Sequence, residues 1–187
     1  SAYMVHDEQK VNLVREILRA KGKDLSHVLI FASSIKSVKE IMKTLNRSGM
    51  KASDMHSGLD QQQREDTIRD FKNKKIRILV ATDILSRGID IKGIELVINY
   101  EVPHDAEDYV HRIGRTARAD RTGEAITFIN QKQVRNFKDI EKLIEKEISK
   151  TELPKGFSKA PEYKVFSKKK KQWNNKKNFK KPQNKNN

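Results

Sequence analysis

Three arginines, Arg112, Arg115 and Arg118, stand at intervals of three residues in the segment 109–118. A spacing of three places side chains along one face of a helix. A guanidinium group keeps its charge and presents a planar fork of donors, so several on one face suit a cluster of phosphate oxygens. Gly114, which lies between them, would let a ligand or another backbone approach closely. Taken alone, the arginines also fit a solvated basic helix face, so their assignment depends on the rest of the chain.

A second polar segment lies upstream, directly after an apolar run. The residues Ile78–Ala81 end abruptly at Thr82 and Asp83, two residue types that are favoured at helix N-caps. A short turn with Arg87 and Gly88 follows. This pattern predicts a buried parallel strand that delivers polar groups at its carboxyl end. Ligands of open α/β sheets bind at that edge.

The elements that would position these residues alternate in type. Apolar runs and their spacing predict strands at 28–31, 51–55, 78–81, 96–98 and 125–129, and helices near 11–18, 35–45, 60–72, 105–113 and 130–149. Gly49 is expected as a helix C-cap. In the last helix, six residues are expected to face inward: Val134, Phe137, Ile140, Leu143, Ile144 and Ile148. The alternation predicts a three-layer α/β fold, a parallel sheet with helices on both faces.

A change of composition near residue 150 predicts a folded domain over residues 1–150 and a basic tail over residues 151–187. The first part holds 28 Lys and Arg against 23 Asp and Glu, whereas the second holds 12 Lys against 2 Glu. Few apolar residues remain after position 150, so the tail is expected to be mostly disordered, with 151–166 packing loosely on the domain. Its lysines, interleaved with Trp173 and Phe179, offer charge for phosphates and rings for base stacking. A solubilising tail with no specific role is the alternative interpretation.

The chain contains no cysteine, which excludes disulfides and thiolate metal sites and is compatible with a reducing cytoplasm, the expected location. Its longest apolar runs, such as residues 28–32, are too short to span a bilayer. No amphipathic helix accompanies the basic tail, so no membrane partner is expected.

The two polar segments resemble the later motifs of superfamily 2 helicases, specifically of the DEAD-box RNA helicases. Residues 81–90 read Ala-Thr-Asp-x-x-x-Arg-Gly-x-Asp, and residues 111–118 read His-Arg-x-Gly-Arg-x-x-Arg. The resemblance covers about residues 3–130 and includes a strand with a small polar end at 28–34 and a Gln-x-x-Arg signature at 61–64. The sequence His-Ser-Gly-Leu-Asp at 56–60 departs from the usual His-Gly-Asp. Ala117 stands where many relatives have Gly, a form similar to the RhlE-like bacterial subgroup.

The resemblance implies the second, C-terminal RecA-like domain of an ATP-dependent RNA helicase that unwinds short duplexes by domain closure. The sequence has no Gly-x-x-x-x-Gly-Lys-Ser/Thr loop and no Asp-Glu-Ala-Asp box, which serve to cradle phosphates and to help hold the metal ion. We therefore expect no ATPase activity without an N-terminal RecA-like domain of the same chain. ATP and Mg²⁺ are the implied cofactors, bound mainly by that domain, and no metal ligands are expected here. Single-stranded and duplex RNA are the implied partners, bound independently of base sequence.

By resemblance, Arg115 and Arg118 reach the γ-phosphate of ATP as catalytic residues, with Arg118 as the arginine finger. Asp90 would bind the ribose hydroxyls, although a turn Asp that caps local amides is the plainer alternative. Coupling to the other domain is implied for Arg87, His111 and Arg112. The implied RNA-facing residues supply hydroxyls, an amide, a cation and exposed backbone, and they are Ser33, Ser34, Gly58, Gln61, Arg64 and Thr82. Thr82 also fits a simple helix N-cap.

Two rival interpretations stay open. Another superfamily 2 enzyme, such as a DEAH-type or DNA helicase, has a similar second domain, but it usually carries Gln-x-Gly-Arg-x-Gly-Arg where His-Arg-Ile-Gly-Arg stands at 111–115. A protein without enzymatic activity, an RNA chaperone whose basic tail provides the binding, is the rival from a different class.

Overall fold

The computed structural model describes residues 1–22, 25–83, 91, 93–116 and 123–165. Within these residues, seven strands form one sheet in the order β3-β4-β2-β5-β6-β1-β7, and every pairing in it is parallel. The strands are β1 Ala2–Met4, β2 Val28–Phe31, β3 Ala52–Met55, β4 Ile78–Ala81, β5 Leu96–Asn99, β6 Glu124–Ile129 and β7 Lys150–Thr151. The helices are α1 Lys10–Ala20, α2 Ile35–Arg47, α3 Gln61–Lys72, α4 Ala106–Ile113 and α5 Val134–Leu143, with 3₁₀ turns η1 Asp7–Gln9 and η3 Gln131–Gln133.

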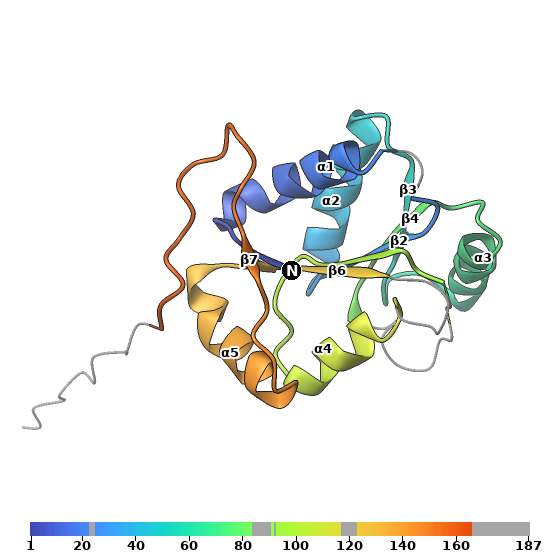
Figure 1. Ribbon diagram of the computed structural model, residues 1–187. Helices are drawn as coiled ribbons and strands as arrows, with labels where there is room; N and C mark the ends of the chain where they lie inside the picture. Colours follow the sequence, from blue (N-terminus) through green and yellow to red (C-terminus); the bar gives the residue numbers. More distant parts are fainter. Residues whose placement is uncertain (23–24, 84–90, 92, 117–122, 166–187) are drawn as a thin grey trace, which may run out of the picture.

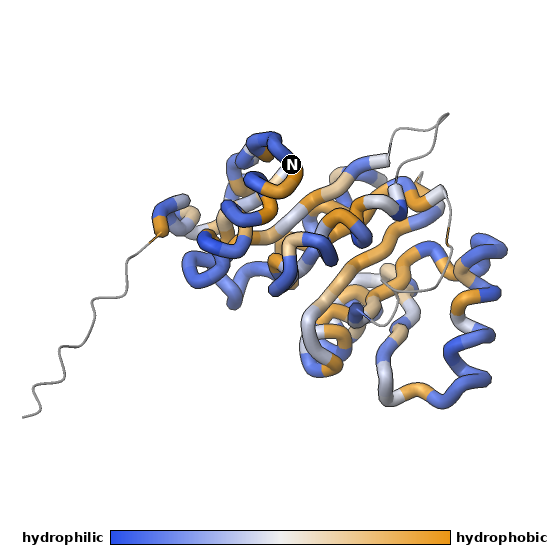
Figure 2. The backbone as a smooth tube through the Cα atoms, turned by 90° about the horizontal axis from the view of Figure 1, so that it is seen from below, coloured by the Kyte–Doolittle hydropathy of each residue, from blue (hydrophilic) through white to orange (hydrophobic). Residues whose placement is uncertain are grey.

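Helices cover both faces of the sheet, which confirms the predicted three-layer RecA-like class. Helices α1 and α2 pack on one face, and α4 and α5 pack on the other (Figure 1). Because side chains alternate along a strand, Val28 and Ile30 of β2 face α1 and α2, while Leu29 and Phe31 face the side that carries α3. Hydrophobic colour accordingly follows the strands, whereas α3 is mostly hydrophilic (Figure 2). Its contribution to the core is Phe71 with the partly buried Ile68.

Most predicted elements are confirmed, and their ends have local causes. Helix α2 begins after Ser34, whose hydroxyl accepts a hydrogen bond from the Ser37 amide, and Gly49 follows its end with a φ of 74°. Helix α3 begins after Asp60, which forms a capping box with Gln63. The capping residue thus lies just outside the helix that was expected to include it.

The predicted helix over 130–149 is wrong in length. Helix α5 ends at Leu143, and Glu145 adopts a φ of 50°, a left-handed conformation that breaks the helix. Leu143, expected inside, is 48 % exposed. Ile148 is buried, but it reaches the core from extended chain, where its amide donates to the Glu141 carboxylate at 2.8 Å. The helical spacing of apolar residues in the sequence continues beyond the point at which the backbone leaves the helix.

Residues 152–165, here called the C-terminal strap, lie against the domain (Figure 1). Leu153 and Phe157 pack against the core cluster of α1 and α2, whereas Tyr163 packs against the cluster of α5. Tyr163 also donates a hydrogen bond of 2.5 Å to Glu141. The strap therefore contacts both helical layers, beginning directly after β7.

Polar contacts fix the course of the strap along one edge of the sheet. The Lys159 carbonyl lies 3.2 Å from the His6 ring nitrogen, and the Lys164 carbonyl accepts from the Gln131 side chain at 2.7 Å. His6 follows β1 and Gln131 follows β6, so the strap ends at the carboxyl edge of the sheet. None of the helices in the described ranges is long and apolar enough to cross a bilayer.

Candidate functional site

The predicted polar residues lie beyond the carboxyl ends of adjacent strands. The register pairs Phe31 of β2 with Ala81 of β4, and Ala81 with Met55 of β3. Directly beyond, the Thr82 amide donates to the Met55 carbonyl at 3.0 Å. The ends of β3, β4 and β2 therefore stand side by side, and the loops that leave them carry Gly58, Thr82 and Ser33 to one edge.

The loop after β3 is organised around His56, which is 5 % exposed. Its Nδ1 accepts a hydrogen bond from the Gly58 amide at 3.1 Å, so the ring proton sits on Nε2, which lies 3.2 Å from Asp54 Oδ2. A Cβ at Gly58 would approach the same ring to 3.1 Å. The ring leaves little room there, and glycine keeps the loop backbone close and exposed.

Gln61 and Arg64 share the first turn of α3, as their spacing predicted. Arg64 Nε donates to the Leu59 carbonyl at 3.0 Å, and the Gln61 amide donates to Glu65 at 2.6 Å. Arg64 is half-buried and fixed against the preceding loop, whereas Gln61 is exposed. The pair forms a polar, partly cationic rim next to Gly58.

Glu101, which follows β5, organises the end of β2. Its carboxylate accepts from the Ser33 amide at 2.9 Å and from the Ser37 hydroxyl at 3.2 Å. Ser34 caps α2 through Ser37. Ser33 and Ser34 are exposed, but the Ser33 amide and the Ser34 hydroxyl already have local partners that any ligand must share.

Arg112 is the most enclosed cation of the site, with a side chain that is 2 % exposed. Its Nε and Nη2 lie 2.8 and 2.6 Å from Asp83 Oδ1. Its Nη1 donates to Asn99 Oδ1 at 3.2 Å, and the guanidinium lies 5.0 Å from the centre of the Phe31 ring. Arg112, expected to reach another domain, is thus committed to contacts that join α4 to β2, β4 and β5.

The strand register explains how this polar cluster continues through the sheet. Phe31, Asn99 and Thr127 are consecutive partners on β2, β5 and β6, and they point to the same face. Asn99 donates to the Thr127 hydroxyl at 3.1 Å, and both residues are fully buried. Burial raises the pKa of Tyr109, whose hydroxyl is hydrogen-bonded to Thr127. Each buried polar group in this row therefore meets another, as burial requires.

The turn after α4 holds Arg115, which is half-buried. Gly114 has a φ of −59°, and the close approach at its Cα is to the Val110 carbonyl of its own helix, 3.1 Å from a hypothetical Cβ. Gly123 is tighter, because a Cβ there would come within 2.3 Å of the Thr116 carbonyl oxygen. The backbone at Gly123 thus packs directly on the turn that carries Arg115.

His111, the residue before Arg112 on α4, is exposed, whereas Arg112 is buried. It lines a shallow hollow of about 460 Å³ with Glu107, Val110, Leu143 and Ile144. Three predicted site residues, Arg87, Asp90 and Arg118, lie outside the described residues. The arrangement therefore unites Ser33, Gly58 and Thr82 with their neighbours at one edge and separates buried Arg112 from exposed His111.

Sequence reasoning missed the supporting residues. Asp83 and Gly123 stand in or beside the recognised motifs, yet only the fold shows what they contact. Asn99 had a usable signal, because it is a polar residue at the end of the apolar strand Leu96–Asn99. Glu101 had none, since an isolated carboxylate in a predicted loop is usually solvated.

Comparisons with known proteins agree with this geometry. The family profile described as "Helicase conserved C-terminal domain" matches residues 9–120. The ATP-dependent RNA helicase DbpA of Bacillus subtilis is 40 % identical over 150 residues, which cover 80 % of this chain and 31 % of that protein. A DEAD-box protein of Methanococcus jannaschii superposes with a TM-score of 0.74 at 40 % identity, over 81 % of this chain and 41 % of that one. The structure of the C-terminal domain of the DEAD-box protein Dbp5 gives 0.71 at 30 % identity, over 81 % and 86 %. The chain spans about a third of the length of the curated relatives it matches.

Proposed function

Because this chain belongs to the family of helicase conserved C-terminal domains, in the form found in DEAD-box RNA helicases, we propose that it is the second RecA-like half of an ATP-dependent RNA helicase. Such an enzyme would melt short duplexes when ATP and RNA draw the two halves together. The observation that carries the proposal is the meeting of the β3, β4 and β2 loops with the α4 arginine segment at one sheet edge. ATP hydrolysis and unwinding belong to the whole protein and are part of this proposal.

On the nucleotide side, Arg115 and Arg118 would face the transferring phosphoryl group, with Arg118 as the finger, and Asp90 would hold the ribose. Bound ATP supplies a phosphoryl group whose developing charge needs fixed cations in a site shielded from water. The packing of Gly123 on Thr116 supports this assignment, because it constrains the backbone on both sides of the segment that holds Arg118. Magnesium would be held mainly by the N-terminal domain.

On the RNA side, Ser33, Ser34, Gly58, Gln61, Arg64 and Thr82 would contact the sugar–phosphate backbone. Amides, hydroxyls and one cation at the ends of adjacent strands are suited to phosphates, which carry no base identity. Binding would therefore be independent of base sequence. The fixed Arg64 and the exposed Gln61 supply the cationic and adaptable members of that surface.

Coupling between nucleotide and RNA would divide between direct and indirect residues. His111 and Arg87 would contact the N-terminal domain, His111 from an exposed position. Arg112 would act from within, because it holds Asp83 in the segment that carries both Thr82 and Asp90. A shift of α4 on closure would thus be transmitted to the RNA-facing end of β4.

The basic tail would add affinity for RNA without base selectivity. Residues 166–187 contain nine lysines and no acidic residue, and the strap that precedes them ends at the carboxyl edge of the sheet. That edge also carries the loops assigned to RNA. We propose a cytoplasmic protein, and Ala117 favours the RhlE-like bacterial subgroup.

ATP turnover tests the proposed function. The isolated chain should show no appreciable hydrolysis, whereas the complete protein should hydrolyse ATP with stimulation by RNA. ATP hydrolysis by the highly purified chain would contradict the expectation that a chain without the phosphate-binding loop is inactive. RNA annealing by the complete protein with no ATP dependence would favour the chaperone alternative.

A further inference from the structure

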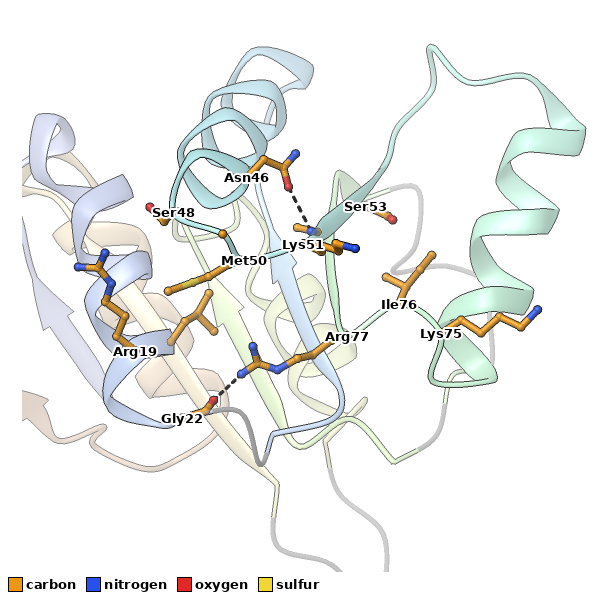
Figure 3. Close-up of a pocket in the computed structure, with 13 residues that line it drawn as sticks. Arg19, Gly22, Asn46, Ser48, Met50, Lys51, Ser53, Lys75, Ile76 and Arg77 are labelled. Carbon is orange, nitrogen blue, oxygen red and sulfur yellow. Dashed lines mark hydrogen bonds between the residues drawn. The ribbon is translucent and has the colours of Figure 1, made fainter.

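A hollow of about 910 Å³ opens at the amino ends of β3 and β4, away from the site described above. Figure 3 shows it between the ends of α1 and α2 on one side and the segment from α3 to β4 on the other. A strand of four residues spans about 13 Å, so an occupant here would leave the carboxyl edge open. The hollow therefore has no part in the proposed contacts with ATP or RNA.

The rim of the hollow is cationic. Arg19, Lys51, Lys75 and Arg77 come from three separate segments, the last two from the connection between α3 and β4, and none of the lining residues in the described part of the chain is acidic. Arg77 is fixed at the centre by bonds to the carbonyls of Leu25 and Gly22, at 2.6 and 2.5 Å (Figure 3). These bonds satisfy backbone groups near the end of α1 and leave the positive charge of Arg77 in place.

The other three cations are available to an incoming group. Arg19 is paired with Glu16 at 3.3 Å and is 53 % exposed, and Lys75 lies 3.5 Å from Asp70 and is 69 % exposed. Exposed pairs of this kind contribute about 0–1 kcal/mol each, so a better anion displaces them readily. Lys51 has no hydrogen-bond or ion-pair partner within the described ranges. Cations are also favoured near the C-terminal ends of helices for purely electrostatic reasons. That preference does not explain why these four cations surround one hollow.

The floor of the hollow is apolar. Leu18 is almost fully buried, and Met50 is partly buried against the same core cluster. Ile76, which also lines the hollow, is partly buried against the core cluster on the α3 side of the sheet. A ribose–phosphate backbone has no group that would gain from this floor, whereas an aliphatic or aromatic side chain would be removed from water there. A cationic rim around an apolar floor thus suits an amphipathic anion better than the sugar–phosphate backbone of a nucleic acid.

We propose that this hollow is a docking site for an acidic peptide segment of a partner protein, with one apolar side chain seated between Met50 and Ile76. Carboxylates on either side of that anchor pair with Lys51 and Lys75, while Arg77 supplies a fixed positive charge below. The partner is recruited from the opposite edge of the sheet while RNA and ATP remain bound. This role does not depend on the proposed helicase activity.

The test uses the 187-residue chain and a fluorescein-labelled peptide, Glu-Asp-Glu-Leu-Phe-Asp-Glu-Glu, followed by fluorescence anisotropy. A second peptide with Ser-Ser in place of Leu-Phe keeps every carboxylate and measures charge attraction, to the tail or to the rim, without an apolar anchor. The double variant Lys51→Glu/Lys75→Glu is compared with Lys142→Glu/Lys146→Glu, which makes the same charge change on exposed lysines at the end of α5. Met50→Gln tests the floor separately.

The wild-type chain should bind the anchored peptide about tenfold more tightly than the Ser-Ser peptide, a difference of about 1.4 kcal/mol. Lys51→Glu/Lys75→Glu and Met50→Gln should abolish this preference, and Lys142→Glu/Lys146→Glu should retain it. Equal binding of the two peptides by the wild type, or equal behaviour of the two double variants, overturns the proposal. A selective loss of single-stranded RNA binding in Lys51→Glu/Lys75→Glu also overturns it, in favour of an RNA surface. Unchanged thermal unfolding of each variant confirms that it is folded.

Discussion

Arg112 and Asp83 form an ion pair that joins helix α4 to the end of strand β4, with two nitrogens of the guanidinium within 2.8 Å of one carboxylate oxygen. Asp83 is 46 % exposed, whereas Arg112 is 2 % exposed. The pair is therefore a connection from a buried helix face to the surface at which ligands are proposed to bind. It also explains why Arg112, an arginine of the recognised motif, is buried inside the domain.

Replacement of Arg112 by Lys should destabilise the domain. Lysine keeps the charge but cannot contact Asp83, Asn99 and the Phe31 ring in one plane. We expect a loss of about 1–3 kcal/mol in the free energy of unfolding, measured by urea denaturation. Arg15→Lys, at a partly exposed arginine paired with Glu16, is the control and should change little. Equal losses in the two variants would contradict the account.

Glu141 should make the stability of the domain depend on pH. Burial acts to raise the pKa of this carboxyl, but hydrogen bonds from Lys150, Tyr163 and the Ile148 amide, with the charge of Lys150, hold the pKa below its ordinary value of 4.5. A lowered folded-state pKa stabilises the fold above the unfolded-state value, and this contribution is lost as pH falls through the folded-state value.

The comparison of wild type with Glu141→Gln therefore has a predicted sign. The wild type should be more stable at pH 7, and its advantage should shrink below about pH 4.5 as the carboxylate is protonated. Urea unfolding at several pH values measures this difference. Glu145→Gln, at an exposed position, should show no such trend. An advantage that grows toward acidic pH would mean that Glu141 is not held as an anion by the strap and Lys150.

Gly123→Ala should impair ATP turnover in the complete enzyme. A Cβ within 2.3 Å of the Thr116 carbonyl forces the backbone to move, and a displacement of about 1 Å at a catalytic group can cost about 10²-fold in rate. Gly58→Ala is the matched control, because its Cβ would be close to the His56 ring, at 3.1 Å, and otherwise only in ordinary contact with Ile35, at 3.9 Å. That control should weaken RNA binding and spare turnover at saturating RNA. If Gly123→Ala weakened RNA binding and Gly58→Ala impaired turnover, the roles assigned to the two glycine positions would have to be exchanged.

Truncation should separate the strap from the rest of the tail. A chain that ends at Val165 loses nine lysines but keeps every strap contact, so RNA affinity and its salt dependence should fall while stability is retained. A chain that ends at Thr151 should also lose stability, because Phe157 and Tyr163 leave the core clusters. Unchanged RNA affinity in the first truncation would support the solubilising role. Calorimetry and RNA titration measure the two effects.

The sequence predicted the layers of the fold better than the contacts of the site. Short apolar runs such as Val28–Phe31 and Ile78–Ala81 are unambiguous, because buried parallel strands carry side chains on two covered faces. The predicted length of the last helix was wrong because Ile148 continues the helical spacing past Glu145, where the backbone has already left the helix. Local periodicity does not register such an exit.

The site divides in the same way. Motif spacing identified Arg112 as important, but its partners Asp83 and Asn99 come from other strands, and only the sheet register brings them together. Gly123 illustrates the same limit, since nothing in the sequence indicates that it packs against Thr116. Residue type predicts chemistry, whereas the choice of partner is a property of the fold.

The most direct test of the central claim is RNA-dependent ATP turnover by the complete protein, comparing wild type and Arg118→Ala with the control Arg135→Ala on α5. If Arg118 is the arginine finger, turnover should fall by about 10³-fold or more, while RNA affinity is largely retained and the control resembles wild type. Unchanged turnover in Arg118→Ala would contradict the assignment of the arginine segment to the nucleotide, and RNA binding by the tail would become the leading account of the function.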